Sequence, residues 1–400
     1  MNIFGKIFCR IYQGAFKLAM PILPYRKPVI MTNVKECVAL LQKLHLSSVL
    51  LITDNFLRTA QITKPLEDFL IENDISVTVY DGTRPNPTVH NVAEATKLYR
   101  EHSCQALIAF GGGSSMDCAK ATGACIVYPR KKLSQMQGLL KVWRSLPPLI
   151  AIPTTAGTGS EVTVTAVITN PEKKHKYTMN NFTMIPHYAI LDPEVTYSLP
   201  PHLTATTGMD ALTHAVEAYI GNSTTKETRK LALDATRLIF QHIETAYSDG
   251  KNQEARAAML KAAYKAGIAF SKSYVGYIHA IAHSLGGQYN IPHGLANSVL
   301  MPILLEAYGD VVYKKLHQLG IAAKVCTQSD SDKEGAEKFI EAIRSLNKKM
   351  QIPETLSGIQ IEDIAKMAKY AAKEANPLYP VPVLLTAKEL EKFYYKVGNL

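Results

Sequence analysis

Ala106-Leu-Ile-Ala-Phe-Gly-Gly-Gly-Ser-Ser-Met-Asp117 carries the clearest signal of the fold in this sequence. Its uncharged apolar run from Ala106 to Phe110 predicts a buried strand, and three glycines follow at once. Glycines let the backbone approach a ligand closely, and the first N–H groups of the next helix suit a diphosphate, with Ser114 or Ser115 as the cap. The turn is neither a GxGxxG fingerprint nor a P-loop. A plain β–α turn is the simpler alternative.

Strands and helices alternate outward from this turn. Further β-rich sequence covers residues 162–168 and 188–191. The Asp81-Gly82 pair is expected to end a strand. Such alternation predicts a mostly parallel sheet with helices on both faces. We expect strands at residues 48–53, 76–80, 106–110 and 149–152, and helices at 34–45, near 61–73, and at 89–102.

A second polar loop, Thr154 to Ser160, follows the strand at 149–152 and offers hydroxyl groups and backbone donors. Two such turns at strand ends indicate a nucleotide site. Asp54 ends the strand at 48–53, where an acid binds ribose hydroxyls and repels a 2′-phosphate. An N-cap for the next helix explains Asp54 equally well. If Asp54 binds ribose, NAD is favoured over NADP.

The character of the sequence changes at Pro200-Pro201. Residues 204–400 are rich in Ala, Leu, Lys and Glu, with long helical periods and little β-branched alternation. We therefore expect three parts: a basic N-terminal extension at 1–25, an α/β dinucleotide-binding domain at 26–199 and a helical catalytic domain at 200–400.

Composition excludes several classes of protein. Of 400 residues, 47% are hydrophobic and 20% charged, so the chain is neither disordered nor collagen-like. The net charge is +10, and half of it lies in residues 1–30, which contain no acid. The remainder is only mildly basic, which argues against a nucleic-acid channel. Six cysteines without a CxxC pair indicate reduced thiols and a cytoplasmic protein.

Residues 2–19 have the pattern of an amphipathic helix that ends before Pro21. Apolar side chains such as Phe4, Ile7 and Ile11 share one arc, opposite Lys6 and Lys17. Three interpretations stay open: contact with an anionic membrane surface, docking on the chain's own domain or another subunit, and a mitochondrial-type presequence.

Histidines and an acid recur at helical spacing in the second half of the chain. Asp210 and His214 are four residues apart, as are His279 and His283, and His293 follows. Residues at i and i+4 share one face of a helix. One carboxylate with several imidazoles indicates a divalent metal site, for Fe²⁺ or Zn²⁺.

Four stretches resemble the iron-containing (group III) alcohol dehydrogenase family, whose fold is similar to that of dehydroquinate synthase. The resemblance implies a Rossmann-like α/β nucleotide-binding domain followed by an all-α metal-binding domain. It also implies hydride transfer between NAD(H), or alternatively NADP(H), and a primary alcohol or aldehyde, with the metal polarising the substrate oxygen. The stretches are Gly111–Asp117, Pro153–Glu161, Thr207–Glu217 and His279–Gly294.

The resemblance also implies roles for single residues. His283 resembles the family's non-ligand histidine near the substrate and would relay a proton. Asp210, His214, His279 and His293 match the metal ligands, for Fe²⁺ or alternatively Zn²⁺. Positions that match cofactor contacts are Asp54, Asn86, Gly112, Gly113, Ser114, Asp117, Thr154, Thr155, Thr158 and Lys176.

Two other functions remain as alternatives. A dehydroquinate synthase-like lyase would also use a metal and NAD, but residues 204–300 show no cluster of Lys and Arg for an acidic phosphate substrate. A membrane-peripheral relative without catalytic activity is the second. As partners we expect a small alcohol or aldehyde, no nucleic acid, a homodimer or higher homo-oligomer, and peripheral membrane contact through residues 2–19. The predicted location is cytoplasmic, with membrane association as an option.

Overall fold

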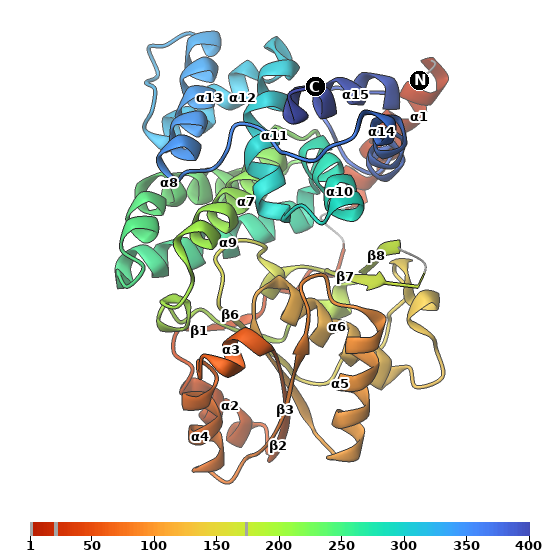
Figure 1. Ribbon diagram of the computed structural model, residues 1–400, viewed down its shortest axis with the longest axis vertical. Helices are drawn as coiled ribbons and strands as arrows, with labels where there is room; N and C mark the ends of the chain where they lie inside the picture. The colour runs from red at the N-terminus through yellow and green to blue at the C-terminus, as the bar shows by residue number, and fades with distance from the viewer. Residues whose placement is uncertain (1–2, 20–22, 173–174) are drawn as a thin grey trace. The chain divides into compact units, whose positions relative to one another are not determined.

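Two units make up the chain in the computed structural model, which describes residues 3–19, 23–172 and 175–400 (Figure 1). An α/β unit comprises Pro24–Leu199, and a helical unit comprises Met1–Leu23 together with Pro200–Leu400. The helical unit is therefore discontinuous in sequence, and the α/β unit lies between its two segments along the chain.

The α/β unit is built on a six-stranded sheet in which every neighbouring pair of strands is parallel. A smaller sheet has the order β5-β8-β7, with β7 (Thr165–Asn170) antiparallel to β8 (His175–Asn180) and β5 (Gly138–Leu139) parallel to β8. The large sheet has the order β1 (Val29–Met31), β9 (Tyr188–Ile190), β6 (Leu149–Pro153), β4 (Ala106–Gly111), β2 (Ser48–Asp54), β3 (Ser76–Thr83).

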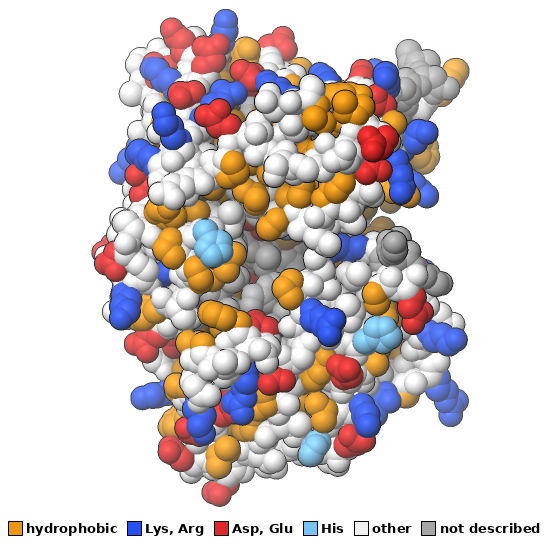
Figure 2. Space-filling model, in the orientation of Figure 1, with side chains coloured by type: hydrophobic (Ala, Val, Ile, Leu, Met, Phe, Trp, Pro, Cys, Tyr) orange, Lys and Arg blue, Asp and Glu red, His pale blue; other side chains and the backbone are white. Residues whose placement is uncertain are grey.

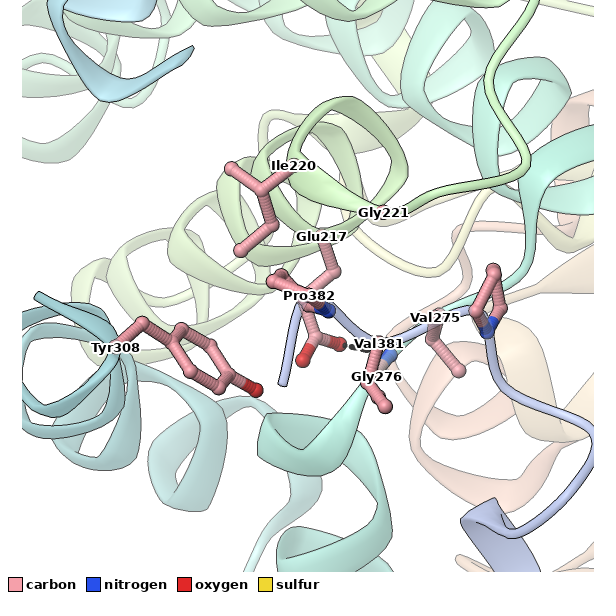
Figure 3. A pocket seen from close by; sticks show the side chains of 9 residues that line it. Glu217, Ile220, Gly221, Val275, Gly276, Tyr308, Val381 and Pro382 are labelled. Carbon is pink, nitrogen blue, oxygen red and sulfur yellow. Dashed lines mark hydrogen bonds between the residues drawn. The ribbon is translucent and has the colours of Figure 1, made fainter. Parts of the chain in front are cut away.

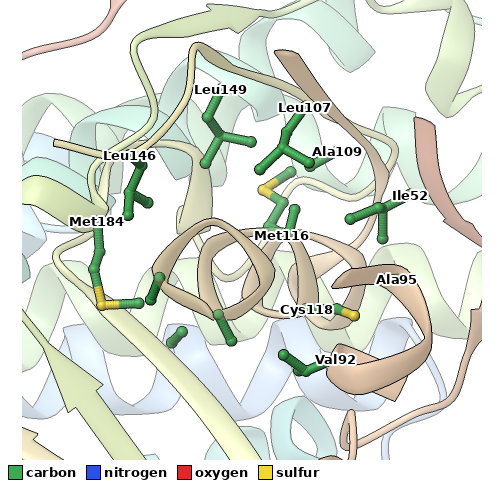
Figure 4. Packing of buried hydrophobic residues seen from close by; sticks show 14 of the residues in the cluster. Ile52, Val92, Ala95, Leu107, Ala109, Met116, Cys118, Leu146, Leu149 and Met184 are labelled. Carbon is green, nitrogen blue, oxygen red and sulfur yellow. The ribbon is translucent and has the colours of Figure 1, made fainter. Parts of the chain in front are cut away.

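Both faces of the central strand β4 are buried, as its uncharged sequence predicts. Leu107 and Ala109 point to one core, which includes α5 (Val89–Glu101) and α6 (Gly113–Val127) (Figure 4). Ile108 and Phe110 point to the other core, formed with α2 (Glu36–Lys43) and α4 (Lys64–Ile71). This period of two assigns alternate side chains of β4 to the two faces of the sheet.

Two sequence-based boundaries in this unit are wrong. The Asp81-Gly82 pair does not end a strand, because β3 continues to Thr83. As β3 is the edge strand, Gly82 weakens only one ladder, and its carbonyl accepts a hydrogen bond from Nδ2 of Asn91 at 2.9 Å. The helix expected near 61–73 begins later, at Lys64, and the shorter α3 (Asn55–Thr59) precedes it.

The cap expected at the glycine-rich turn is also wrong. Helix α6 begins at Gly113 with Gly112 as its N-cap, so Ser114 and Ser115 lie inside the first turn. A Cβ at Gly113 would lie 2.9 Å from Cγ2 of Thr158. Glycine is therefore required where the helix start approaches the polar loop after β6.

Nine helices follow Pro200 among the described residues of the helical unit. Several begin with a reciprocal capping box, such as Thr225 with Thr228 and Ser331 with Glu334. Helix α7 is buried along most of its length and packs against α8, α9 and α11, while α10 packs against α11 and α14. The helices are α7 (Pro201–Ile220), α8 (Lys226–Ser248), α9 (Gln253–Ser273), α10 (Tyr277–Tyr289), α11 (His293–Tyr308), α12 (Asp310–Ala323), α13 (Asp332–Lys349), α14 (Ile361–Ala375) and α15 (Ala387–Gly398).

Helix α1 (Ile3–Ala19) belongs to the helical unit rather than standing apart from it. Arg10 donates to the carbonyls of Val381 and Pro382 at 2.7 and 2.8 Å. Nε2 of the buried Gln13 donates to the carbonyl of Tyr379 at 2.7 Å. The structure thus shows docking on the chain's own domain, one of the three interpretations of this segment. No helix in the described ranges is long and apolar enough to span a membrane.

Candidate metal centre and nucleotide-binding edge

Four side chains from three helices of the helical unit converge on one point. One ligand atom from each lies within 4.8 Å of all the others. Oδ1 of Asp210 is 3.5 Å from Nε2 of His293 and 3.9 Å from Nε2 of His279. Atoms that bind one ion at ~2.1 Å lie up to ~4.2 Å apart, so a small contraction brings all four onto a single cation. The four are Asp210 and His214 on α7, His279 on α10 and His293 on α11.

A buried carboxylate fixes the ring of His279. Oε2 of Glu217 lies 2.6 Å from Nδ1 of His279, and the same carboxylate accepts hydrogen bonds from the backbone N–H groups of Gly276 and Ile278 at 2.8 Å each. Figure 3 shows Glu217 directed toward Gly276 at the start of α10. Because Nδ1 is engaged, Nε2 is the atom of this imidazole that faces the cluster.

Burial governs the ionisation of this pair. Loss of hydration raises the pKa of Glu217 to about 8 and lowers the pKa of His279 well below its usual value, with the neighbouring histidines adding to the second effect. Nε2 of His279 is buried and has no hydrogen-bond partner within the described ranges of the chain. A buried, neutral imidazole nitrogen beside a carboxylate is a suitable ligand for a divalent metal, so the donor set fits one.

The position of His293, the fourth ligand, depends on a close approach of α7 and α11. A Cβ at Gly294 would lie 2.4 Å from the carbonyl oxygen of Thr206 on α7, so only glycine lets the start of α11 come so near. This contact brings His293 beside Asp210. Nδ2 of Asn297, one turn along α11, donates to Oδ1 of Asp210 at 2.7 Å and lies 3.1 Å from Nε2 of His293.

His283 lies next to the cluster but outside the group of four. Its ring stacks on that of His293, with centroids 5.0 Å apart. Its Nδ1 lies 2.6 Å from Oε1 of Glu374, which also accepts a hydrogen bond from the hydroxyl of Tyr379 at 2.7 Å. This geometry leaves Nε2 of a half-buried imidazole for proton exchange, because Nδ1 is held by the carboxylate.

The predicted cofactor residues lie at one edge of the α/β unit. Asp54, Gly111 and Pro153 end the neighbouring parallel strands β2, β4 and β6. After β2 the chain adds β3 on one side of it and then β4 on its other side. The direction in which successive strands are added therefore reverses between β2 and β4. Ligands of open α/β sheets bind beyond the carboxyl ends of strands at such a switch point. Asp54 also caps α3, since its Oδ1 accepts from the N–H of Leu57 at 3.0 Å.

The glycine-rich turn and the second polar loop lie against each other. The N–H of Thr154 donates to the carbonyl of Gly111 at 3.0 Å. Cβ atoms built at Gly112 and Gly113 would lie 3.4 Å from Thr155 and 2.9 Å from Thr158. The two segments thus form one cradle of backbone amides and hydroxyls at the positive end of α6, which suits a dinucleotide diphosphate.

A buried lysine that the sequence did not single out supports this cradle. Nζ of Lys120 donates to Oγ of Ser160 at 2.9 Å, to Oγ1 and the carbonyl of Thr163 at 2.9 and 3.0 Å, and to the carbonyl of Thr165 at 2.8 Å. Burial lowers the pKa of Lys120 to about 8. Asp117 accepts from Ser160 Oγ at 2.9 Å, and burial raises the pKa of its carboxyl. Both side chains therefore hold the loop.

The remaining predicted contact residues also lie in the α/β unit. Nζ of Lys176, on β8, donates to Oδ1 of Asn86 at 2.8 Å, and Asn86 has a left-handed backbone with φ of 59°. Ser114 is half-buried in the first turn of α6. All the predicted residues are thus found at, or bonded to, loops that follow the strands.

Sequence reasoning missed four residues with a structural part in these sites. Two carried a usable signal, because Glu217 stands three residues after His214 and Asn297 four after His293, one helical turn in each case. Glu374 and Lys120 carried none, since both act on residues far away in the chain.

Comparisons with known proteins agree with this geometry. Residues 30–193 match the family model of iron-containing alcohol dehydrogenase, and residues 204–397 match the C-terminal model of the Fe-containing alcohol dehydrogenase family. Alcohol dehydrogenase 4 of Saccharomyces cerevisiae is 37% identical over 343 residues, which cover 85% of this chain and 88% of the yeast protein.

Solved structures show the same fold. The crystal structure of a 1,3-propanediol oxidoreductase superposes with a TM-score of 0.89 and 34% identity, covering 94% of this chain and 99% of that one. Sulfoacetaldehyde reductase from Bifidobacterium kashiwanohense, solved in complex with NAD⁺, gives a TM-score of 0.83 and 28% identity over 94% of this chain and 98% of that chain. Neither matched family range includes residues 1–29.

Proposed function

The chain belongs to the iron-containing alcohol dehydrogenase family, whose members use iron and NAD(H), and we propose that it oxidises a small primary alcohol, or reduces the aldehyde, at the four-residue cluster. In this proposal Asp210, His214, His279 and His293 bind Fe²⁺. The observation that carries it is the convergence of these four side chains around the buried Nε2 of His279.

When bound, Fe²⁺ supplies a Lewis acid for the substrate oxygen and NAD supplies the hydride acceptor. Glu217 keeps the ring of His279 in one orientation by accepting from Nδ1. Asn297 holds Asp210 Oδ1 in place as its amide donates at 2.7 Å. The protein's contribution at this point is positioning, which accounts for much of the rate in such a site.

His283 moves the proton. Glu374 engages Nδ1, so Nε2 takes the proton that leaves the alcohol and passes it to solvent, to which the half-buried ring is open. The stacking of His283 on His293 keeps the ring beside the metal ligands.

The cradle of the α/β unit binds NAD. Backbone amides of Gly112, Gly113 and Ser114 face the diphosphate, and Asp54 accepts from ribose hydroxyls through the oxygen that α3 does not use. An acid at this position repels a 2′-phosphate, so NAD is preferred to NADP.

The test is His279→Ala, with His202→Ala on the exposed start of α7 as the matched control. The first variant loses bound iron, measured by plasma mass spectrometry, and loses turnover, but it binds NAD as tightly as the unchanged protein. The control retains all three. Full iron content and full activity in His279→Ala would remove this ligand assignment.

The relatives' names guide the substrate panel, since they include an alcohol dehydrogenase and a 1,3-propanediol oxidoreductase. Short alcohols and diols are the first compounds to assay, with Fe²⁺ against Zn²⁺ and NAD against NADP. Accumulation of one NADH per alcohol consumed separates this reaction from a lyase that returns its NAD unchanged.

We also propose a homo-oligomer in the cytoplasm. Strand β1 forms one edge of the parallel sheet, and its Val29 is 60% exposed, so an unpaired apolar edge is available to a second copy. Light scattering after gel filtration measures the mass. We propose in addition that residues 2–19 make peripheral contact with a membrane.

A further inference from the structure

Five large apolar side chains of α1 point away from the unit on which the helix docks. With 3.6 residues per turn, Cys9 and Gln13 share one face of α1, and these two are its buried side chains. The opposite face is solvent-exposed. It carries Phe4, Ile7, Phe8, Ile11 and Leu18, a set that we call the outer face of α1.

This arrangement inverts the usual orientation of a docked helix. Phe4 is 76% exposed, Ile11 66% and Leu18 81%. The helix is held on its unit by polar bonds from Arg10 and Gln13 and by the ring of Phe16, which meets that of Tyr274 edge-on with centroids 4.8 Å apart, so these exposed side chains play no part in holding it. A contiguous exposed apolar set of this kind marks an interaction surface rather than scattered surface residues.

The charged side chains of α1 are all basic. Lys6 and Lys17 are exposed on the polar side of the helix, away from the centre of the outer face, and residues 1–30 contain no acid. Lys6 lies near Glu389 at the start of α15, whose pKa it helps to lower, and α1 itself contains no acid. Figure 2 shows hydrophobic, basic and acidic side chains at the upper right, where Figure 1 draws α1 together with α14 and α15.

We propose that the outer face of α1 docks on an anionic lipid bilayer, with the helix lying in the plane of the interface. Phe4, Phe8 and Ile11 enter the region between headgroups and acyl chains, while Lys6 and Lys17 reach the phosphates. Such a helix lies on the membrane without spanning it. The inference goes beyond the dehydrogenase activity and does not depend on it.

A second copy of the chain is the less suitable occupant. Two outer faces in contact would cover five side chains on each copy, well short of the roughly 20–30 residues per side of a stable protein interface, and would leave the lysines outside the contact. An anionic bilayer satisfies the apolar and the basic side chains together. The family-model matches begin at residue 30 and therefore do not include this surface.

Vesicle flotation of the full chain tests the proposal. The protein is expected to float with phosphatidylcholine vesicles that contain about 30% phosphatidylserine, and at least roughly tenfold less with phosphatidylcholine alone. Phe8→Glu abolishes flotation. Val311→Glu, which replaces another exposed apolar residue on α12, leaves it unchanged. Dehydrogenase activity is retained in both variants because neither residue touches the metal cluster.

The fluorescence of a single tryptophan placed in α1 gives an independent measurement of membrane contact. Trp143 is the only tryptophan of the chain, so Phe8→Trp combined with Trp143→Phe reports on α1 alone. Its emission shifts to the blue with the anionic vesicles and not with the neutral ones. Equal flotation with both vesicles, flotation of Phe8→Glu, or an unshifted emission overturns the proposal. The proposal is also overturned if the unchanged protein does not float and Phe8→Glu lowers its oligomer mass. The outer face of α1 would then be covered by a second copy of the chain.

Discussion

Oε2 of Glu217 and Nδ1 of His279 lie 2.6 Å apart in the interior of the helical unit, and neither residue is open to solvent. The two are 62 positions apart in the chain, so this contact joins α7 to the start of α10. It converts a flexible imidazole into a ligand with one available nitrogen. A carboxylate that orients a metal-binding histidine in this way commonly raises the affinity of the site for its metal, in addition to fixing the orientation of the ring.

Glu217→Gln is expected to weaken iron binding about 10- to 100-fold, because the amide accepts from His279 less strongly and holds the ring less firmly. Chelator competition on the apoprotein measures this affinity. The control is Glu244→Gln on α8, whose carboxylate pairs with Lys349 at the surface. Equal affinities in the two variants would show that the ring needs no such support.

Glu374→Gln is expected to lower kcat about tenfold at unchanged iron content, because His283 loses the carboxylate that fixes its Nδ1. Tyr379→Phe, which removes one hydrogen bond from Glu374, has a smaller effect in the same direction. Glu362→Gln, at the exposed start of α14, is the control. Steady-state kinetics give kcat for each variant, and metal analysis gives its iron content. A loss of iron in Glu374→Gln would contradict the role of Glu374 as a partner of His283 alone.

Lys120→Met is expected to weaken NAD binding roughly tenfold, because several buried acceptors of the loop after β6 lose their donor at about 1–3 kcal/mol each. Calorimetric titration with NAD measures the effect, and iron binding in the other unit should not change. Lys97→Met on the exposed side of α5 serves for comparison. An unaltered NAD affinity would mean that the loop keeps its shape without Lys120.

Gln13→Ala is expected to destabilise the helical unit by about 1–3 kcal/mol, since the carbonyls of Pro377 and Tyr379 lose a buried donor. Urea unfolding followed by circular dichroism gives the value. Faster amide exchange at residues 377–382 would locate it. Lys17→Ala, an exposed change on the same helix, should shift the urea midpoint little.

Glu161 gives a pH dependence with a definite sign. Burial raises the pKa of its carboxyl to about 7, so the folded protein holds the proton more tightly than the unfolded chain. This stabilising contribution is complete below about pH 4.5 and is lost as the pH rises to about 7, up to on the order of 3 kcal/mol. Glu161→Gln removes the dependence, and the variant should therefore gain stability relative to the unchanged protein between pH 5 and pH 7 or so. Parallel stability curves would exclude this role for Glu161.

Much of the fold follows from local sequence. The uncharged runs that became β2, β4 and β6, and the glycines after β4, predicted the parallel sheet and the edge that carries the polar loops. The convergence of acid and histidines was also predictable, because Asp210 and His214 lie one helical turn apart, as do His279 and His283, and His293 follows ten residues later. The spacing alone offered five ligands, and the fold separates His283 from the other four.

What the sequence did not reveal depends on tertiary contact. Strand β3 runs through Asp81-Gly82 because it lies at the sheet edge, a fact that only the strand order supplies. The cap of α6 is Gly112 rather than a serine because Thr158 lies against the turn. Glu374 reaches His283 across 91 positions. Strand β8 was not predicted, and its partner β7 was not expected to leave the large sheet.

The helical unit takes its first helix from one end of the chain and the rest from the other. During synthesis on the ribosome α1 is made before the α/β unit, yet its docking site at residues 377–382 emerges only after that unit and most of the other helices. The nascent chain therefore carries α1, with its apolar side chains exposed, for most of translation. A chaperone, or a bilayer of the kind proposed above, has most of the elongation time in which to bind it.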